Sequence, residues 1–318
     1  MTGTIYKSTG SWYVVRTADG GQWNARIKGI FKLDEITSTN PLAVGDVVEL
    51  EPGAEGGDEA TAMITAIHDR KNYINRQSPS HKMQHHIIAA NVDQSLLIAT
   101  LKEPRTSQGF IDRHLVACEA YHVPAIVVFN KADLYKRKED EKFSAWKEMY
   151  EAIGYRIIRM SVQTGEGVAE LEALLRGKTS LLSGHSGVGK SSLLNAILPD
   201  LKLKTQGVSG WSGKGIHTTT FAEMYDLPGA PSVPGHPAGR IIDTPGMREF
   251  GLVDISKAEL SGYFPEMRAL VGQCQFNNCV HREEPGCAVK QAVREGRIHE
   301  DRYISYCGIL DSIGEKNY

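Results

Sequence analysis

Apolar and polar residues alternate through the first 70 positions of this chain, which is the pattern of half-buried strands. Turn-forming residues interrupt the alternation at Ala18–Gly21 and Pro52–Asp58. The expected strands are Gly3–Ser8, Trp12–Arg16, Gln22–Ile27, Asp46–Leu50 and Ala62–Ile67. Five short strands in so short a segment are typical of a small barrel of the OB type. We therefore predict an N-terminal OB-type β-barrel over residues 1–70.

A different pattern begins at Val92, where apolar runs alternate with helical stretches as they do in a parallel α/β sheet. The expected strands are Gln94–Thr100, Ala125–Phe129, Arg156–Met160, Thr179–Ser183 and Arg240–Ile242. The expected helices are Ile111–Tyr121, Asp140–Ile153, Val168–Leu175 and Lys190–Leu198. We interpret residues 71–91, rich in basic and polar side chains, as a basic linker. The α/β domain is expected over residues 92–252, and helical periodicity predicts a C-terminal helical domain over residues 253–318.

The overall charge argues against nucleic-acid binding through a global positive field. The 318 residues include 36 basic and 38 acidic side chains, for a net charge of -2, so any RNA contact must come from local patches. No stretch approaches the roughly 18 consecutive apolar residues of a membrane span, and no basic start precedes an apolar run. We expect a cytoplasmic monomer with neither a membrane nor DNA as its partner.

A glycine-rich motif carries the clearest chemical signal. Residues 184–191 read GHSGVGKS and fit the phosphate-loop pattern GxxxxGK[ST], between an apolar strand and an amphipathic helix. Backbone N–H groups of such a loop surround phosphate oxygens at a helix N-terminus. Lys190 is expected to reach the β and γ phosphates, and the Ser191 hydroxyl to coordinate Mg²⁺. The residues expected to bind nucleotide here are Gly184, His185, Ser186, Gly187, Val188, Gly189, Lys190, Ser191 and Ser192.

Two further motifs indicate that the base is guanine. Asn130, Lys131 and Asp133 follow an apolar strand in the order NKAD, which resembles the NKxD signature of Ras-like GTPases. A carboxylate such as Asp133 accepts from two donors on the guanine edge while Lys131 packs over the base, so adenine is rejected. Ser161 and Val162 form a second base-binding element after the next strand, although the usual pattern has alanine after the serine.

The sequence DTPG at residues 243–246 matches the DxxG motif. Asp243 is expected to hold Mg²⁺ through water, and the Gly246 amide to sense the γ-phosphate. Thr219, in a run of three threonines, is expected to close over the metal when GTP is bound. Met247 stands where Ras-like enzymes carry a water-orienting glutamine, so we expect slow hydrolysis by the protein alone. His217 is either the missing catalytic group or a solvated loop residue. The candidate catalytic residues are His217, Lys190 and Thr219.

The order of these motifs is permuted. Ras-like proteins run from the phosphate loop to the switch threonine, DxxG, NKxD and the serine loop, whereas here NKAD and Ser161 come first. The same site can form if the old termini are joined and a surface connection is broken, because function depends on the assembled site. The pattern therefore predicts a circularly permuted P-loop GTPase domain whose second switch leads directly into the C-terminal domain.

Three of the five cysteines lie close to a histidine in the C-terminal region. The residues are Cys274, Cys279, His281 and Cys287. Three thiolates and one imidazole suit a closed, tetrahedral, structural site, so we expect one zinc ion per chain and a helical zinc-binding domain. Cys307 is a less favoured fourth ligand, and Cys118 is expected in the core of a helix.

Together, the NKAD, phosphate-loop, threonine and DTPG motifs and the Cys/His spacing resemble the ribosome small-subunit-dependent GTPase A family (RsgA, also called YjeQ or YloQ). The resemblance covers the whole chain, and the hydrophobic residue Met247 also fits it. It implies a GTPase that binds GTP and GDP with Mg²⁺ and acts late in maturation of the small (30S) ribosomal subunit. The same resemblance implies contact with 16S rRNA and activation by the subunit. Val162 and the Pro/Gly-rich stretch Leu227–Gly239 depart from the family pattern.

Support for RNA binding from the residues themselves leaves alternatives open. An RNA-facing patch or a solvated linker is formed by Arg70, Lys71, Arg76 and Lys82 with His68, Tyr73, His81, His85 and His86. Trp12, Tyr13 and Trp23 either stack on bases or belong to the barrel core. The rival functions are a GTP-dependent switch acting on a different RNA or protein partner, and a nucleic-acid-binding module with a vestigial nucleotide site.

Overall fold

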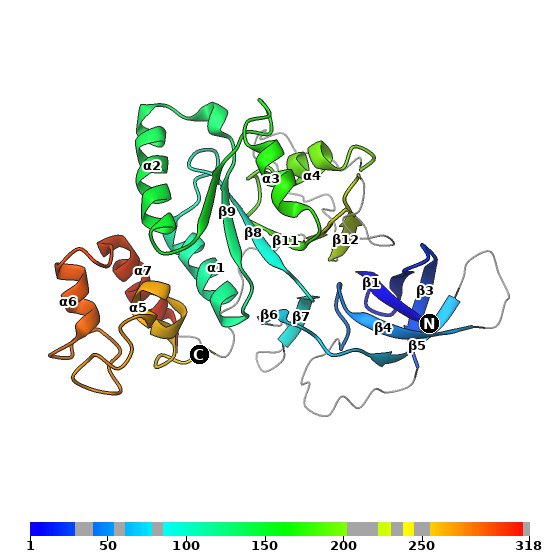
Figure 1. The fold of residues 1–318 in the computed structure, drawn as a ribbon, viewed down its shortest axis with the longest axis horizontal. Coiled ribbons are helices and arrows are strands. Elements are labelled where there is room, and N and C mark those ends of the chain that lie inside the picture. Colours follow the sequence, from blue (N-terminus) through cyan, green and yellow to red (C-terminus); the bar gives the residue numbers. More distant parts are fainter. Residues whose placement is uncertain are drawn as a thin grey trace, which may run out of the picture.

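The computed structural model describes residues 1–28, 41–53, 61–77, 85–201, 222–229, 238–244 and 255–313. Figure 1 shows three parts side by side: a barrel that holds the N-terminus, a central sheet covered by helices, and a helical lobe. Among the described residues, no helix is both long enough and apolar enough to cross a membrane.

The N-terminal barrel is a closed ring of five strands. They are β1 (Thr2–Ser8), β2 (Tyr13–Thr17), β3 (Gln22–Ile27), β4 (Val47–Pro52) and β5 (Thr61–Ile67). The order around the ring is β1-β2-β3-β5-β4, and β4 pairs again with β1. Strands β3 and β5 are parallel and the other neighbours antiparallel. Ile5, Val15, Val48 and Ile64 are fully buried at its centre. The prediction of an N-terminal barrel is confirmed.

The segment that follows the barrel is more ordered than its composition indicates. β6 (Tyr73–Gln77) and β7 (His85–Ala90) form an antiparallel pair. Ile74 and Ala89 are buried because they pack in one cluster with Val44 of the barrel and Val92 of the central domain. Residues 71–91, interpreted above as a basic linker, therefore contain a two-stranded sheet. A few buried apolar residues among many polar ones are enough to hold this two-stranded sheet against the two domains.

The central sheet has the strand order β10-β9-β8-β11-β13-β12. Its strands are β8 (Gln94–Ala99), β9 (Ala125–Phe129), β10 (Arg156–Arg159), β11 (Thr179–Ser183), β12 (Glu223–Asp226) and β13 (Arg240–Asp243). Neighbours are parallel except for β12, which is antiparallel to β13. Strand β12 was not expected from the sequence, because its residues begin and end with an acidic side chain and lack the paired isoleucines of β10 and β13.

Helices cover both faces of this sheet, as Figure 1 shows. They are α1 (Gln108–Ala120), α2 (Arg137–Glu151), α3 (Val168–Leu175) and α4 (Lys190–Ile197). On β8, Leu96 and Ile98 pack in the cluster with α3 and α4, whereas Leu97 and Ala99 pack with α1 and α2. Because both faces are covered, every residue of β8 is buried, which explains its nearly unbroken apolar run.

The barrel and the central sheet are continuous through one strand pairing. β1 pairs antiparallel with β12 where Lys7 faces Glu223, and the two sheets join into eleven strands. Residues of both parts meet there in one apolar cluster that includes Tyr6 of β1 and Met224 of β12. We call this contact, formed by β1 and β12 with the side chains around Asp226, the barrel seam.

The C-terminal lobe, residues 255–313, is helical. It consists of η2 (Leu260–Tyr263), α5 (Pro265–Arg268), α6 (Ala288–Arg294) and α7 (Glu300–Ser312). Its apolar cluster includes Val116 of α1, so the lobe packs against the outer face of that helix. Arg302 of α7 is fully buried at this contact, between Asp112 of α1 and Glu266 of α5. The predicted helical C-terminal part is confirmed.

Candidate nucleotide site and metal centre

The predicted nucleotide motifs meet at one edge of the central sheet. The phosphate loop follows β11, NKAD follows β9, Ser161 lies just after β10, and Asp243 ends β13. Since these strands are parallel, their carboxyl ends lie at the same edge, where open α/β sheets bind ligands. Motifs that are far apart and permuted in the chain therefore come together.

The phosphate loop is tightly closed around its glycines. Gly184 and Gly189 have φ values of 136° and 97°. A Cβ on Gly184 would lie 2.4 Å from the Ile98 carbonyl oxygen, and one on Gly189 would lie 2.4 Å from Asn130 Nδ2. Lys190 Nζ donates to the carbonyl oxygens of Gly184 and His185. With these oxygens bound by the lysine, the loop presents N–H groups to its other side, as a phosphate cradle requires.

Asp243 and Lys190 form the charged part of this edge. Burial lowers the pKa of Lys190, and the Asp243 carboxylate opposes that shift. Burial raises the pKa of Asp243, and Lys190 opposes it in turn. Asp243 Oδ1 and Ser183 Oγ are buried without a hydrogen-bond partner among the described residues. Two unsatisfied buried oxygens at the ends of β11 and β13, with the half-buried Lys190 following in the phosphate loop, fit a site completed by a hydrated divalent cation and phosphate.

The NKAD motif is bonded to both neighbouring loops. Asn130 is buried, and its Nδ2 donates to the Val188 carbonyl oxygen at 2.8 Å, which ties the motif to the phosphate loop. Its Oδ1 accepts from the Val162 amide at 3.3 Å. The Ser161 hydroxyl donates to Asp133 Oδ1 at 2.5 Å, so the serine aims the carboxylate. The Asn130 side chain thus connects the phosphate loop to the serine loop.

The remaining predicted positions divide into two groups. Lys131 has a left-handed backbone, with a φ of 63°, and its ammonium donates to the Glu103 carbonyl oxygen. Ser191 and Ser192 lie in the first turn of α4. Outside the described residues lie His217, Thr219, Gly246, Met247 and positions 230–237 of the Pro/Gly-rich stretch.

Two residues of this edge were not singled out from the sequence. Ser183 is the last residue of β11, directly before the phosphate loop, and that position was the signal that could have found it. Thr106 lies in the loop between β8 and α1, and its hydroxyl is 2.7 Å from His185 Nε2. The sequence offers one indication of its role: Thr106 lies in a loop that follows the carboxyl end of a central strand.

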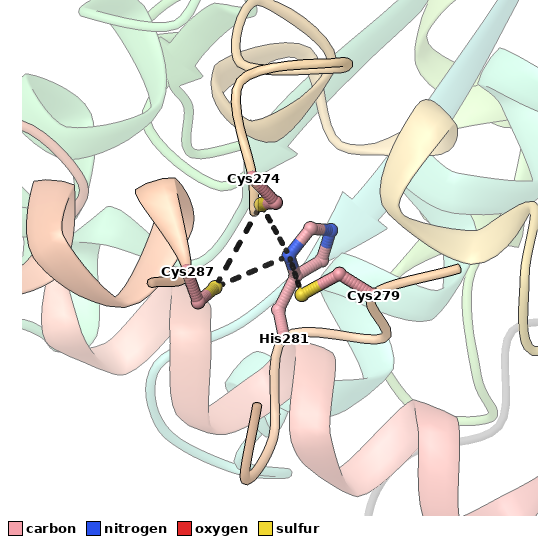
Figure 2. Close-up of side chains that lie close together, drawn as sticks. All are labelled: Cys274, Cys279, His281 and Cys287. Carbon is pink, nitrogen blue, oxygen red and sulfur yellow. Dashed lines mark hydrogen bonds between the residues drawn. The ribbon is translucent and has the colours of Figure 1, made fainter. Parts of the chain in front are cut away.

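The four predicted metal ligands converge in the C-terminal lobe. Figure 2 shows the sulfur atoms of Cys274, Cys279 and Cys287 around one ring nitrogen of His281. That nitrogen, Nδ1, is 3.4 Å from the sulfurs of Cys279 and Cys287 and 3.6 Å from that of Cys274. All four ligand atoms lie within 4.8 Å of one another, so they suit a single metal ion.

The surrounding backbone fixes this arrangement. Cys287 is the N-cap of α6 and its sulfur accepts from the Lys290 amide at 3.4 Å, which holds the sulfur in place. The Tyr303 hydroxyl donates to the His281 carbonyl oxygen at 2.7 Å. Burial and the neighbouring thiols raise the pKa of Cys279 to about 12. Without a compensating cation the Cys279 sulfur therefore keeps its proton at neutral pH.

The barrel residues considered for RNA binding separate into different roles. Tyr13 is buried in the barrel core, and Trp23 packs against it. Trp12 is 39% exposed, with the Arg26 guanidinium 3.7 Å from its ring centroid, so it is not a core residue. Arg70 does not belong to an RNA-facing patch, because its guanidinium is held by the buried Asp46 carboxylate at 2.6 Å.

The strand order and the motif order together define a circularly permuted P-loop GTPase, with a barrel in front and a helical Cys/His lobe behind. The RsgA GTPase family matches residues 67–253, and the RsgA N-terminal domain matches residues 2–60. The chain belongs to the RsgA GTPase family, so the predicted family resemblance and the predicted GTPase activity are confirmed.

Known relatives match along nearly the whole chain. The small ribosomal subunit biogenesis GTPase RsgA of Flavobacterium psychrophilum is 49% identical over 99% of this chain and 94% of that protein. The protein of the same name from Cytophaga hutchinsonii is 51% identical over 98% of both chains. The crystal structure of YjeQ from Thermotoga maritima matches with a TM-score of 0.77 and 34% identity over 99% of both chains. YloQ, described as a circularly permuted GTPase, matches with a TM-score of 0.70 and 30% identity, covering 100% of this chain and 96% of that one.

Proposed function

We propose that this protein hydrolyses GTP in the late maturation of the small ribosomal subunit, and that the subunit stimulates the hydrolysis. The observation that carries the proposal is the assembly of the phosphate loop, NKAD and Asp243 at one sheet edge, in a chain that matches RsgA proteins from end to end. The names of those relatives point to the small subunit as the target. A switch acting on a different RNA or protein partner has no comparable support.

In this proposal the phosphate end of GTP lies in the cradle of the phosphate loop. Lys190 neutralises charge on the β and γ phosphates, while Ser191 and Asp243 hold Mg²⁺, Asp243 through water. The ion, when bound, offsets charge that develops on the phosphate oxygens. Thr219, Gly246 and His217 keep the roles expected from the sequence. The proposed nucleotide ligands also include His185, Ser186, Gly187, Val188, Gly189 and Ser192.

The base is proposed to lie between NKAD and the serine loop. Asp133, aimed by Ser161, is placed to accept from two donors of guanine, and Lys131 is placed to cover the ring. Selection would follow from hydrogen bonding, because adenine lacks the two donors that guanine offers and would leave the Asp133 carboxylate without them.

We propose that the Cys/His cluster holds one structural zinc ion. A tetrahedral zinc ion with zinc–sulfur bonds of about 2.3 Å and a zinc–nitrogen bond of about 2.0 Å would separate its ligand atoms by roughly 3.5–3.8 Å. Four of the six separations among Cys274, Cys279, His281 and Cys287 run from 3.4 to 4.0 Å, and all six lie within 4.8 Å, which is close to the size of such a site. With four protein ligands, no position is left for a substrate.

The proposed division of labour follows the predicted domains: 1–70 as an OB-fold barrel, 71–91 as the connector, 92–252 as the GTPase domain and 253–318 as the zinc domain. We propose that the barrel and the zinc domain contact 16S rRNA, the barrel partly through Trp12 and Arg26. The protein is proposed to act as a cytoplasmic monomer.

The decisive experiment measures GTP turnover of the full-length protein with and without purified small ribosomal subunits. We expect slow basal turnover and an increase of about a hundredfold with subunits, equivalent to a barrier lower by roughly 2.7 kcal/mol. Lys190→Ala should remove turnover under both conditions, and Lys138→Ala, an exposed lysine of α2, should not. Large subunits serve as the partner control. Equal turnover with and without small subunits would contradict the proposed target, whereas normal turnover by Lys190→Ala would contradict the proposed site.

A further inference from the structure

The loop between β8 and α1 is anchored directly to the phosphate loop. Thr106 is 1% exposed, and its Oγ1 accepts from the Thr100 amide at 2.9 Å. The Thr106 amide donates to the Thr100 carbonyl oxygen at 2.8 Å, which closes the loop at its base. The same Thr106 Oγ1 lies 2.7 Å from His185 Nε2. A rigid, buried hydroxyl therefore touches the second residue of the phosphate loop.

The contacts of His185 assign its proton. Its Nδ1 lies 3.2 Å from the Ser186 carbonyl oxygen, which can only accept, so Nδ1 carries the hydrogen. In a neutral imidazole Nε2 then holds a lone pair, and the Thr106 hydroxyl donates to it. Thr106 uses its single proton toward His185 and a lone pair toward the Thr100 amide. Every group in this chain of hydrogen bonds is satisfied in one way only.

The surroundings keep the ring neutral and fixed. Burial lowers the pKa of His185; the hydrogen bond to Ser186 acts against this shift and the Lys190 charge acts with it, and the pKa remains lowered. The Phe110 ring packs edge-on against the imidazole, with 5.4 Å between centroids. A neutral ring of set orientation delivers its N–H to one carbonyl oxygen.

That carbonyl belongs to a peptide group of the cradle. In a trans peptide the C=O and the following N–H point in opposite directions. When His185 holds the Ser186 oxygen, the Gly187 N–H is turned toward the other side of the loop. Lys190 holds the two preceding carbonyl oxygens, of Gly184 and His185. Three consecutive carbonyls are thus bound, and the third depends on the imidazole.

We propose that Thr106 and His185 are positioning residues for GTP binding, which orient the Ser186–Gly187 peptide so that its N–H faces the nucleotide phosphates. The inference rests on the proposed role of the phosphate loop. It adds the loop after β8 to the nucleotide site, although Thr106 itself touches no phosphate.

The test measures dissociation constants of the full-length protein for fluorescent GDP and for a fluorescent non-hydrolysable GTP analogue. We expect Thr106→Val and His185→Ala each to weaken binding about fivefold to tenfold, the effect of one lost hydrogen bond. The double variant should bind no more than about twofold more weakly than His185→Ala, because both changes break the same relay. Thr106→Ser keeps the hydroxyl and should bind within about twofold of the parent.

Two controls separate this inference from the site itself. Thr65→Val removes an exposed hydroxyl of the barrel and should leave binding unchanged. Lys190→Ala in the same assay tests the phosphate loop: normal binding by that variant would overturn the proposed site. Loss of binding by Lys190→Ala with parental binding by Thr106→Val, or effects that add in the double variant, would overturn the relay alone. Thermal melting of each variant shows that the measured protein is folded, and Thr106→Ser supplies the reading if Thr106→Val does not fold.

Discussion

The barrel and the C-terminal lobe both attach to the GTPase domain, the barrel through the sheet and the lobe through helix α1, but the charged groups at the two contacts differ in their exposure to solvent. At the lobe, Arg302 is 1% exposed and its guanidinium pairs with Asp112 of α1 and with Glu266 at 2.7 Å. The Tyr150 hydroxyl of α2 also donates to Asp112, at 2.7 Å. At the barrel seam, the charged pairs stay in contact with solvent: the side chains of Lys7 and Glu223 are 34% and 25% exposed.

Asp226 is the hub of the seam. It accepts from the Tyr6 hydroxyl at 2.6 Å and from Arg16 at 2.9 Å, while Arg240 of the neighbouring strand donates to the Tyr6 oxygen at 3.1 Å. Removing one partner of a buried charge cluster strongly destabilises the fold, because the other charges remain unpaired in the interior. Half-exposed pairs rearrange with water at little cost. We infer that the contact of the lobe tolerates little rearrangement, whereas the ion pairs of the barrel seam can rearrange at small cost in free energy.

Removal of the metal should produce the largest difference between the two attachments. Structural zinc contributes apparent binding energies of roughly 10–16 kcal/mol, so chelation or Cys287→Ser should unfold the metal loop and free α6 and α7. Hydrogen exchange should rise in those helices and stay unchanged in the barrel strands. Acid should act as chelation does, because protonation of the sulfurs competes with the metal. Cys307→Ser, outside the cluster, is the matched control. Elemental analysis that finds no zinc, or equal exchange in both parts, would contradict the proposed site.

Breaking the ion cluster should have the next largest effect. Arg302→Met leaves Asp112 and Glu266 buried without their partner, and we expect a loss of about 3–5 kcal/mol in the free energy of unfolding. Urea unfolding measures it, and Arg294→Met, an exposed arginine of α6, is the control. A loss below about 1 kcal/mol would mean that the lobe contact is as tolerant as the seam.

Tyr6→Phe should have a smaller effect at the seam. The change removes hydrogen bonds to Asp226 and Arg240 but keeps the ring, which is 4% exposed, in its apolar cluster. We expect a loss of about 1 kcal/mol in the free energy of unfolding, since water can reach the remaining groups. The same urea measurement applies, with Tyr73→Phe as the exposed control. A loss as large as that of Arg302→Met would erase the contrast.

Lys7→Ala should have the smallest effect. A pair as exposed as Lys7–Glu223 contributes roughly 0.2–1 kcal/mol, and salt screens it. The difference between variant and parent should shrink from low to 0.5 M salt, whereas the difference for Arg302→Met should persist. If the loss of stability caused by Lys7→Ala persisted in high salt, the Lys7–Glu223 pair would be less accessible to solvent than its exposed fraction indicates.

Local pattern was sufficient for most elements and for the motifs. The strands Gln22–Ile27, Ala125–Phe129 and Thr179–Ser183 agree with the sequence prediction to the residue, because each is a compact apolar or alternating run bounded by turns. Spacing likewise singled out the four ligands that converge in the lobe. These features depend on neighbours along the chain.

Contacts between residues far apart in the chain could not be predicted in this way. Asp112 and Arg302 are 190 positions apart, and in the sequence each is one charge on a helix among many. The partner of β1 in the barrel seam, the short strand β12, directly precedes the Pro/Gly-rich stretch Leu227–Gly239, which departs from the family pattern. His185 fitted a motif position that accepts any residue, so nothing in the sequence linked it to Thr106. Such pairings are decided by tertiary packing.

The continuous sheet also imposes an order on synthesis. Lys7 is synthesised 216 residues before its partner Glu223. At about 5–20 residues per second, the barrel waits on the order of 10–40 s for that strand. Pairing of Thr2–Thr4 with β4 closes the first part of β1 early, and the end around Lys7 is left for β12. A lysine at a waiting strand edge discourages pairing with other chains. Lys7 therefore disfavours intermolecular pairing at the free end of β1 until β12 of the GTPase sheet has been synthesised and pairs with it.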